Sequence, residues 1–583
     1  MRYFVVWVVA VLVTCGINPV ACHAECQVGK LAELPVMMDG MQPITEAKIN
    51  GAPARFMIDS GAFSSIISPG TARTLGLHPE PVRDFYMVGI NGTATAGLVK
   101  VSSLVVGDTN LGRAQFLVGG SETGGAGVLG QELLGFDDIE YDLPHGMVRL
   151  FKSTGCEQLS MAYWAAGRPM DVVPIAAHSR EQPYTIGSVE LNGKPVRATF
   201  DTGASASIVS LRAAARAGIK PGDPGVKSAE GASGFGRGYV QTWIAPFASF
   251  KIGDEEIKNT KILIGQLGPD IDMLVGADFF VAHRIYVANG QHKMFLTYEG
   301  GSIFNLKATQ EDAGGREIKS PPSSQPTSNN PAELLRIGGV AIAQRDYDKA
   351  ITTLTQAITS SPRDPRYLEE RASAFVGKNE KDRAIADLDE AIAIAPKDLR
   401  ALLARSALRL SKDDKAGAIA DLDSADQSLA GPADEKYEIA QLYIEADAPA
   451  RAIAPLGFWI TSHPADARYL SAINLRCWAR GLADQELAMG LEDCNNALRL
   501  APYAPELRGS RGLIEFRLGQ WRSALSDYNA ALAQQPKASW SLFGRGVVKQ
   551  RLGDVAGAKA DLDAARAIWP MITEKAKLFD VAP

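Results

Sequence analysis

A chain of 583 residues is too long for one ordinary domain and indicates three or four. With 46% hydrophobic and 22% charged residues, its composition is that of a soluble globular protein. The formal net charge of −6 offers no basic surface, so nucleic acid is not an expected partner. The seven histidines never recur at metal-ligand spacing, and we therefore expect no metal and no cofactor.

The N-terminus has the features of an export signal. A basic residue and the apolar run YFVVWVVAVLVTC are followed by the small residue Ala24. We predict a signal peptide at residues 1–24, cut after Ala24. Two alternatives stay open. One is a bacterial lipoprotein cut before Cys22, although Pro19 stands where such sites usually carry Leu. The other is an uncleaved anchor formed by residues 3–22.

All three alternatives place the bulk of the chain outside the cytosol, in the bacterial periplasm or secreted. Membrane association is expected only if the N-terminal segment is uncleaved or lipidated, since no later segment is apolar enough to cross a bilayer. Export makes disulfides permissible. Cys26 and Cys156 bracket the first domain and can pair. For Cys477 and Cys494, on one predicted helical hairpin, a bridge and two buried free thiols are equally compatible with the sequence.

Residues from about 30 to 300 are rich in Val, Ile, Thr, Phe and Gly, with short apolar runs between turn residues, which predicts an all-β architecture. The region is a duplication, because Asn50-Gly51 matches Asn192-Gly193 at a shift of 142 residues. Asn-Gly between alternating apolar runs predicts a tight hairpin turn, since both residues tolerate positive φ. We place domain 1 at residues 30–155 and domain 2 at 165–300.

Each half carries three short motifs at matching offsets. An apolar strand leads into Asp-Ser/Thr-Gly-Ala, a glycine-rich loop begins 30 residues after the aspartate, and two apolar residues with Gly follow later. One Asp-Thr-Gly alone would be weak, since Asp and Gly are common in turns, but its repetition at equivalent places is specific. The motifs are Asp59-Ser60-Gly61-Ala62, Gly89-Ile90-Asn91-Gly92 and Val128-Leu129-Gly130, then Asp201-Thr202-Gly203-Ala204, Gly231-Ala232-Ser233-Gly234 and Leu274-Val275-Gly276.

Over about residues 40–300 this constellation resembles the retropepsin-like aspartic peptidases, whose motif is Asp-Ser/Thr-Gly-Ala. The resemblance implies two acid-protease β-barrel domains facing each other across a pseudo-twofold axis. Here both are in one chain, so the site needs no homodimer. It also implies that Asp59 and Asp201 are catalytic, and that the hydroxyls of Ser60 and Thr202 cross the axis to bond the opposite loop.

Paired aspartates have a direct chemical rationale. Two carboxylates about 3 Å apart do not both ionise, so they hold one proton between them. The ionised partner takes a proton from water while the protonated one polarises the scissile carbonyl. The sequence does not tell which of Asp59 and Asp201 is the base, because their titrations belong to the pair. Gly61 and Gly203 allow the backbone to approach the carboxylates without a Cβ.

The two glycine-rich loops would be flap tips that close over an extended peptide bound as an added strand. Either loop alone would be an ordinary hairpin turn, and only their equivalence favours flaps. The halves also differ. Phe63 stands where the second copy has Ser205, and the second loop carries extra glycines and Phe235, so the subsite shapes are not predicted. We expect Glu132 and Asp278 to be helix-start residues and not catalysts.

Residues 302–331, which contain KSPPSSQPTSNNP, predict a linker. Beyond it small residues recur every 34 positions with one four-residue insertion, and most units end in Pro. This pattern resembles seven copies of the tetratricopeptide repeat (TPR) over residues 332–572, an all-α superhelix. The small residues are Ala350, Ala384, Ala418, Ala452, Gly490, Ala524 and Ala558. We expect the helix charges to be mostly solvated, including Arg383, Asp387, Asp389, Asp421 and Asp423.

The sequence as a whole predicts an exported aspartic endopeptidase that hydrolyses peptide bonds and carries a TPR array for a substrate or an unidentified protein partner. The main alternative is a catalytically inactive scaffold that binds peptides through the peptidase fold and the repeats. The intact Asp-Ser/Thr-Gly in both halves favours the enzyme. A self-processing zymogen has weak support, because residues 25–40 are short for a propeptide.

Overall fold

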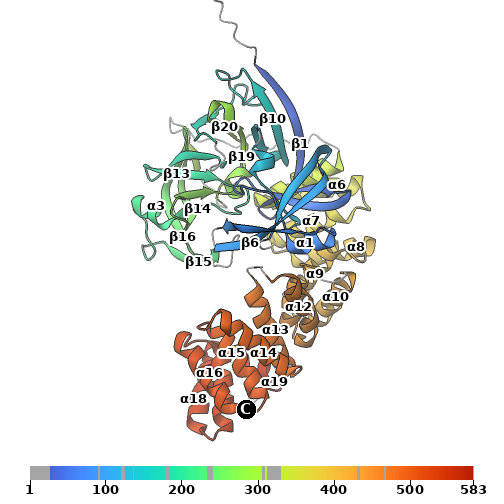
Figure 1. The fold of residues 1–583 in the computed structure, drawn as a ribbon, viewed down its shortest axis with the longest axis vertical. Coiled ribbons are helices and arrows are strands. Elements are labelled where there is room, and N and C mark those ends of the chain that lie inside the picture. Colours follow the sequence, from blue (N-terminus) through green and yellow to red (C-terminus); the bar gives the residue numbers. More distant parts are fainter. Residues whose placement is uncertain are drawn as a thin grey trace, which may run out of the picture.

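The computed structural model describes residues 26–89, 92–119, 125–135, 137–178, 183–232, 240–304, 309–311, 330–429, 433–464, 466 and 468–581. The predicted signal peptide and most of the predicted linker lie outside these residues. Within them, every helix is too short or too polar to span a bilayer. The chain forms two β-rich domains followed by a curved array of helices, as predicted (Figure 1).

Domain 1 is built from ten strands, two short α-helices and a 3₁₀ turn. Its elements are β1 (Gln27–Asp39), β2 (Gln42–Ile49), β3 (Ala52–Ile58), β4 (Ile66–Ile67), α1 (Pro69–Thr74), β5 (Glu80–Gly89), β6 (Gly92–Val106), β7 (Thr109–Val118), β8 (Gly127–Leu129), α2 (Gln131–Leu134), β9 (Asp138–Asp142), η1 (Leu143–His145) and β10 (Met147–Thr154).

Domain 2 repeats this order, with β11 in the place of β1, and is followed by one extra strand. Its elements are β11 (Asp171–Pro174), β12 (Ile186–Leu191), β13 (Lys194–Phe200), β14 (Ile208–Ser210), α3 (Leu211–Arg216), β15 (Lys227–Ala232), β16 (Val240–Ile252), β17 (Glu255–Gly265), β18 (Met273–Val275), α4 (Ala277–Phe280), β19 (His283–Ala288), η2 (Asn289–Gln291), β20 (Lys293–Tyr298) and β21 (Thr309–Glu311).

The duplicated Asn-Gly turns connect β2 to β3 and β12 to β13. All four residues have positive φ: 51° at Asn50, 86° at Gly51, 50° at Asn192 and 72° at Gly193. This left-handed pair matches the twist of the flanking strands, as the sequence predicts. Each turn fixes the register of the strand that ends at an aspartate of the Asp-Ser/Thr-Gly motif.

The two domains share one sheet. Strand β9 of domain 1 pairs antiparallel with β19 of domain 2, with Glu140 opposite Tyr286. Glu140 is buried and accepts hydrogen bonds from Arg149 (2.7 Å), Arg284 (2.8 Å) and Tyr163 (2.7 Å). Because Arg149 and Arg284 come from different domains, one buried carboxylate ties the halves together across the shared strands.

The described residues from 330 onward form seven antiparallel helix pairs and one final short helix. They are α5 (Pro331–Ala343), α6 (Tyr347–Ser360), α7 (Pro365–Gly377), α8 (Lys381–Ile394), α9 (Leu399–Leu410), α10 (Lys415–Ser428), α11 (Lys436–Glu445), α12 (Pro449–Ser462), α13 (Tyr469–Ala483), α14 (Leu487–Leu500), α15 (Pro505–Arg517), α16 (Trp521–Gln534), α17 (Ser539–Arg551), α18 (Val555–Ile568) and α19 (Ile572–Lys577).

Small residues let the paired helices approach. A Cβ added at Gly338 would lie 2.6 Å from Cγ of Leu354, and one at Gly546 would lie 2.8 Å from Cγ of Leu562. The seven recurring small residues of the sequence pattern are all buried where the second helix of each pair packs. The 34-residue period therefore records the packing of each hairpin, as predicted.

A ladder of buried ion pairs runs through the repeats and corrects the expectation that Asp387 and Asp421 are solvated. An arginine on the first helix holds an aspartate on the second, at 2.5–2.7 Å. Arg383 and Asp389 are exposed, as expected. The pairs are Arg371–Asp387, Arg405–Asp421, Arg476–Asp493, Arg511–Asp527 and Arg545–Asp561. The 34-residue steps from Arg371 to Arg405 and from Arg511 to Arg545 are a signal that the sequence contains.

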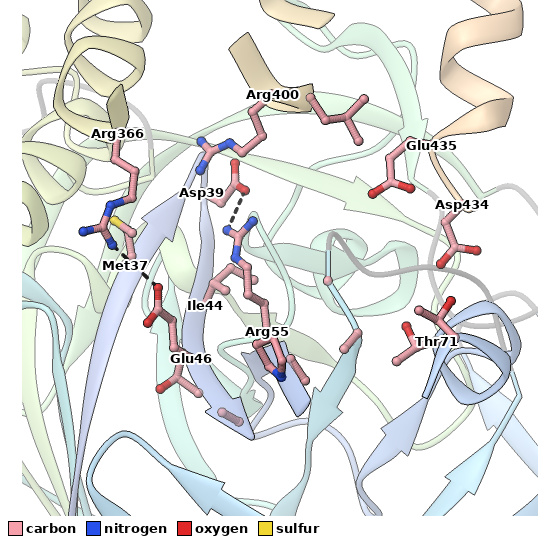
Figure 2. Close-up of a pocket in the computed structure, with 18 of the residues that line it drawn as sticks. Met37, Asp39, Ile44, Glu46, Arg55, Thr71, Arg366, Arg400, Asp434 and Glu435 are labelled. Carbon is pink, nitrogen blue, oxygen red and sulfur yellow. Dashed lines mark hydrogen bonds and ion pairs between the residues drawn. The ribbon is translucent and has the colours of Figure 1, made fainter. Parts of the chain in front are cut away.

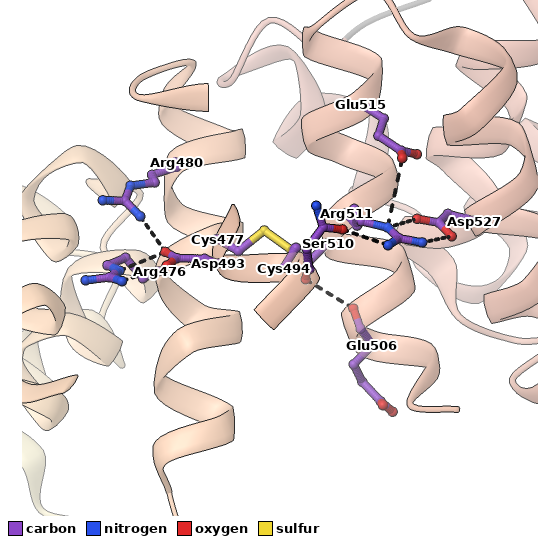
Figure 3. Close-up of a disulfide and its surroundings, with 11 residues drawn as sticks. Arg476, Cys477, Arg480, Asp493, Cys494, Glu506, Ser510, Arg511, Glu515 and Asp527 are labelled. Carbon is purple, nitrogen blue, oxygen red and sulfur yellow. Dashed lines mark hydrogen bonds and ion pairs between the residues drawn. A yellow bond between two sulfur atoms is a disulfide. The ribbon is translucent and has the colours of Figure 1, made fainter. Parts of the chain in front are cut away.

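Both cysteine pairs form disulfides. Cys26–Cys156 closes the ends of domain 1 over a separation of 130 residues. Cys477–Cys494 joins α13 to α14 over 17 residues, beside the Arg476–Asp493 pair (Figure 3). Both sulfur atoms of the second bridge are in the interior, since Cys477 and Cys494 are fully buried. The structure thus selects the bridge over two free thiols.

The helical array is packed against the β domains. Val340 and Ala343 of α5 belong to the same hydrophobic core as the two β domains. The side chain of Gln344 donates to the carbonyl oxygens of Val281 (2.7 Å) and Gly300 (3.2 Å) in domain 2. In Figure 1 the first helices lie beside the β region, and the later ones extend away from it to the C-terminus.

The predicted linker begins too early. Ile303 and Phe304 are buried, and β21 pairs with β17 at the positions Glu256↔Glu311 and Lys258↔Thr309. Residues after 302 therefore still belong to domain 2. The Pro/Ser composition further along the segment concealed this short strand, because its pairing depends on a partner some 50 residues earlier in the chain.

Candidate active site

The two aspartates end matching strands. Asp59 follows β3, and its backbone N–H donates to the carbonyl of Leu129 at 3.0 Å. Asp201 follows β13, and its N–H donates to the carbonyl of Val275 at 2.9 Å. The apolar-apolar-Gly motifs provide β8 and β18, which pair parallel with β3 and β13. Each motif therefore holds one aspartate loop in place.

Ser60 and Thr202 interlock across the domain interface. The Ser60 hydroxyl donates to the carbonyl of Phe200 at 2.9 Å and accepts from the Thr202 N–H at 2.9 Å. The Thr202 hydroxyl donates to the carbonyl of Ile58 at 2.7 Å and accepts from the Ser60 N–H at 3.0 Å. Both hydroxyls are buried, so the four bonds fix the two loops relative to each other.

The glycines after these hydroxyls make room for the opposite carboxylate. A Cβ at Gly61 would lie 2.3 Å from Cγ of Asp201, and one at Gly203 would lie 2.4 Å from Cγ of Asp59. No real Cβ tolerates such a contact. The carboxyl groups of Asp59 and Asp201 thus meet in the space between the two glycines.

The two carboxyl groups are not equivalent. Burial and then the negative charge of Asp201 raise the pKa of Asp59 well above its ordinary value. Burial also raises the pKa of Asp201, against the opposing effect of its backbone hydrogen bonds. Oδ1 of Asp201 accepts from Gly203 N–H (2.9 Å) and Ala204 N–H (3.2 Å), whereas Oδ1 of Asp59 accepts from Gly61 N–H (2.9 Å). The hydrogen bond between the two carboxyls raises the pKa of Asp59 and lowers that of Asp201, which favours Asp59 as the carboxyl that carries the shared proton.

This arrangement provides an acid and a base side by side. Both aspartates are half-buried, so their carboxyl groups remain within reach of a bound molecule. An ionised Asp201 can accept a proton from water, and a protonated Asp59 can donate one to a carbonyl oxygen. Among the described residues, no cluster of three or more His, Cys, Asp or Glu side chains could hold a metal ion.

Only part of each predicted flap lies in the described chain. In the first half, Gly89 ends β5 and pairs with Gly92 at the start of β6, which forms a hairpin. Ile90 and Asn91 lie outside the described residues. In the second half, Gly231 and Ala232 are the last residues of β15, and Ser233 and Gly234 lie outside the described part.

Glu132 and Asp278 lie in the first turns of α2 and α4, as predicted. Each binds a serine of its own aspartate loop. Glu132 accepts from the N–H of Ser65, and Asp278 accepts from the N–H of Ser207 (2.9 Å) and from its hydroxyl (2.7 Å). Burial raises the pKa of Asp278 to about 6. These carboxylates support the loops and do not reach the space between Asp59 and Asp201.

Three polar residues near the aspartates escaped the sequence reasoning. Gln131 binds the backbone of the Asp59 loop, and Tyr141 lies in the interior beneath it. Tyr184 is half-buried, and burial followed by the charges of Asp59 and Asp201 raises the pKa of its phenol. The shift of 142 aligns Tyr184 with Gln42, a difference that could have drawn attention to it.

A cleft of about 1350 Å³ separates domain 1 from the first helices of the array. Figure 2 shows Arg366 and Arg400 above it, with Arg55 between them and the strands below. Arg55 pairs with Asp39 at 3.3 Å, and Arg366 lies 3.9 Å from Glu46. The lining continues to an acidic side on α11 and the segment before it, and to two residues just before β8. The further lining includes Asp434, Glu435, Glu438, Gly125 and Ala126.

The far side of the cleft is closed by a second contact between the array and domain 1. Asp434, before α11, accepts from the hydroxyl of Ser68 at 3.4 Å and pairs with buried His463. Arg73 of α1 donates to the carbonyl of Ser462 at the end of α12. Because Ser68 caps α1 just after the Asp59 loop, the fourth repeat is held directly on domain 1.

Family models match four segments of the chain. Residues 45–135 match "gag-polyprotein putative aspartyl protease", and residues 187–279 match "Aspartyl protease". Two tetratricopeptide repeat models match residues 335–399 and 470–542.

Similar solved structures are TPR proteins. YrrB, described as a TPR protein with an unusual peptide-binding site, is 19% identical, with 38% of this chain and 97% of that chain covered and a TM-score of 0.24. A TPR protein from Parabacteroides merdae is 16% identical, with 43% and 98% covered and a TM-score of 0.32. The TPR2B domain of yeast Sti1 is 27% identical, with 21% and 98% covered and a TM-score of 0.19. No curated protein matches the chain.

Proposed function

We propose that this chain, which carries two aspartyl protease domains followed by tetratricopeptide repeats, is an endopeptidase that uses Asp59 and Asp201 to hydrolyse peptide bonds. The observation that carries the proposal is the interlocked pair of loops. Four hydrogen bonds between Ser60, Thr202 and the opposite backbones hold two carboxyl groups together with one proton between them.

The asymmetry of the pair determines which carboxyl accepts and which donates a proton at each step. Ionised Asp201 removes a proton from a water, whose oxygen attacks the scissile carbonyl carbon, while Asp59 gives its proton to the carbonyl oxygen. A tetrahedral diol results. Collapse of the diol breaks the C–N bond, with the proton on Asp201 passing to the leaving nitrogen and a diol proton returning to Asp59. The cycle ends with the starting protonation of both carboxyls.

The test is cleavage of a peptide library between pH 4 and 7 by the full-length protein. Asp59→Asn and Asp201→Asn should each lower the rate by about 10²- to 10⁴-fold. Asp270→Asn, an exposed carboxylate of domain 2, serves as the matched control and should cleave like the wild type. Circular dichroism and thermal melting check that all variants fold. Full activity in either dyad variant would sink the two-aspartate mechanism.

The rival function is a peptide-binding scaffold without catalysis. It requires that the wild type cleaves no library member yet binds peptides with affinities that Asp59→Asn leaves unchanged. Both results are read from the same library, by mass spectrometry and by fluorescence anisotropy. Two intact aspartates in a fully hydrogen-bonded setting favour the enzyme, since binding alone needs no pair of carboxyls that resist joint ionisation.

We propose in addition that the repeats act in substrate binding, through the cleft between domain 1 and the array. β3 leads from Arg55 in the cleft to Asp59 over four residues, about 13 Å of strand. An extended polypeptide can therefore occupy both. Lys48 and Glu435 are exposed cleft residues on opposite walls, and neither is in an ion pair among the described residues.

Reversing either charge should raise KM for long substrates and leave short peptides unaffected. The variants are Lys48→Glu and Glu435→Lys, and the control is Lys194→Glu, exposed on domain 2. The expected change is a few-fold in KM, because single exposed charges contribute about 0.2–1 kcal/mol. Equal KM values for long substrates in all three variants would remove the cleft from the proposal.

We also expect export, with residues 1–24 absent from the mature N-terminus; N-terminal sequencing of the secreted protein tests this.

A further inference from the structure

The loop that carries Asp59 has a buried polar support. Nε2 of Gln131, on α2, donates to the carbonyl oxygen of Ser60 at 2.9 Å, and Gln131 is only 3% exposed. That carbonyl and the N–H of Gly61 belong to the same peptide group. The Gly61 N–H in turn donates to Oδ1 of Asp59 at 2.9 Å. Gln131 therefore acts on the Asp59 carboxyl through a single peptide plane.

Tyr141 extends this support into the interior. It lies on β9, is 1% exposed, and packs edge-on against Phe280 of domain 2, with ring centroids 5.4 Å apart. Its hydroxyl is near the side chains of Ser60 and Gln131. Oε1 of Gln131 and the hydroxyl of Tyr141 are both buried, and neither completes a hydrogen bond of normal geometry with a described atom. A buried amide oxygen and a buried hydroxyl on neighbouring side chains are natural partners, as acceptor and donor.

Domain 2 has no counterpart to this support. Ala277 occupies the place of Gln131, because its N–H donates to the Ala204 carbonyl as that of Gln131 donates to the Ala62 carbonyl. Val287 occupies the place of Tyr141, since it pairs with Met294 as Tyr141 pairs with Val148. Neither alanine nor valine has a side-chain donor. Among the described hydrogen bonds, none reaches the Thr202 carbonyl from a side chain.

We propose that Gln131 and Tyr141 are positioning residues that act on one aspartate only and tune the proton release of Asp59. The inference rests on the proposed function and deepens it. Hydrogen bonds in a chain polarise one another, so a donor on the Ser60 carbonyl strengthens the Gly61 N–H bond to the ionised form of Asp59. Asp59 is the carboxyl that must pass its proton to the substrate's carbonyl oxygen. Gln131 and Tyr141 stabilise the Asp59 carboxylate that remains after this transfer, and they do not act on Asp201.

The deciding variant is Gln131→Met, which keeps the length of the side chain and removes its donor. Without that donor Asp59 is harder to ionise, so the basic limb of the kcat/KM profile should move to higher pH. kcat should fall about fivefold to tenfold, the effect of one lost hydrogen bond, with KM unchanged. Tyr141→Phe should change the basic limb and kcat in the same directions, but by smaller amounts. Leu134→Met, buried on the same helix, is the packing control and should keep the wild-type profile.

A second readout needs no substrate. Carbon-13 labelling of the aspartate carboxyls lets NMR follow the titration of Asp59 and Asp201 in the full-length protein. The higher apparent pKa of the pair should rise in Gln131→Met and stay in place in Leu134→Met. An unchanged titration and an unchanged pH profile would overturn the positioning role while leaving peptidase activity intact. If the wild type cleaves nothing, the proposed function fails, and the titration still tests the positioning role. If Gln131→Met does not fold, Tyr141→Phe tests that role instead.

Discussion

At the scale of single residues, the most constrained positions are the glycines between the carboxyls. The Cβ of Gly61→Ala would lie 2.3 Å from Cγ of Asp201, so the variant must push Asp201 aside. We expect at least a hundredfold loss of peptidase activity, as for other displacements of catalytic groups. Gly268→Ala, at a position where an added Cβ meets nothing within 4 Å and the backbone is not left-handed, is the control for the general effect of the substitution. Wild-type activity in Gly61→Ala would show that the carboxyls need not meet.

The raised pKa of Asp59 has a consequence for stability. A carboxyl whose pKa is higher in the folded protein than in the unfolded chain stabilises the fold below its unfolded pKa, about 3.9. That contribution is lost as the pH rises through the higher, folded value. Asp59→Asn has no such titrating group. The melting temperature of this variant, relative to that of the wild type, should therefore rise as the pH is raised from 4 to 8. A difference in melting temperature that stays constant, or that changes in favour of the wild type, over this range contradicts the raised pKa of Asp59.

At the scale of elements, the ion-pair ladder stabilises the repeats. Arg405 binds Asp421 inside its own repeat and Asp389 on the preceding one. Asp421 is 4% exposed, and removing it leaves Arg405 and Arg409 without this partner. Asp421→Ala should destabilise the array by about 3 kcal/mol. Asp389→Ala removes a partner that is 53% exposed and should change stability by less than about 0.5 kcal/mol. Urea unfolding followed by circular dichroism compares the two; equal values would show that burial does not decide the effect.

The elements were predictable from sequence where their causes are local or periodic. The Asn-Gly turns follow from backbone preferences, and the helix pairs follow from a 34-residue period of small residues. The proximity of Asp59 and Asp201 was predictable only because the sequence contains a duplication with one aspartate in each copy. The pairing of β9 with β19, the strand β21 and the contact of α5 with both domains depend on partners distant in the chain, and no local pattern encodes them. Gln131 and Tyr141 escaped because only their position beneath the loop, and not their sequence neighbours, gives them a role.

At the scale of the whole molecule, two disulfides constrain very different lengths of chain. Cys26–Cys156 spans 130 residues and Cys477–Cys494 spans 17. In the chain-entropy account, loss of the first should cost about 4–5 kcal/mol and loss of the second about 3 kcal/mol. Double serine variants at each pair, melted with and without reductant, test the order. Reductant should destabilise the wild type further than it destabilises either double variant, and a reversed order between the two bridges would contradict the loop-length argument.

The array contacts the β domains through its first and fourth repeats. Val340 and Ala343 complete the β-domain core, and Asp434 with His463 holds α1. The fourth repeat also interrupts the ion-pair ladder, with Ile439 and Pro455 at the ladder positions. Repeats five to seven resume the ladder beyond it. A fragment that begins at residue 331 would expose the apolar face of α5, so binding studies are best done on the full chain.

The unequal supports beneath the two aspartate loops bear on how such a chain can change over generations. In an enzyme assembled from two copies of one polypeptide, every substitution occurs twice, and a glutamine placed under one aspartate is placed under both. Joining the halves in a single reading frame removes that restriction. Gln131 and Tyr141 in one half, with Ala277 and Val287 in the other, are differences that a dimer of two identical copies cannot have. Acid and base can then be improved separately.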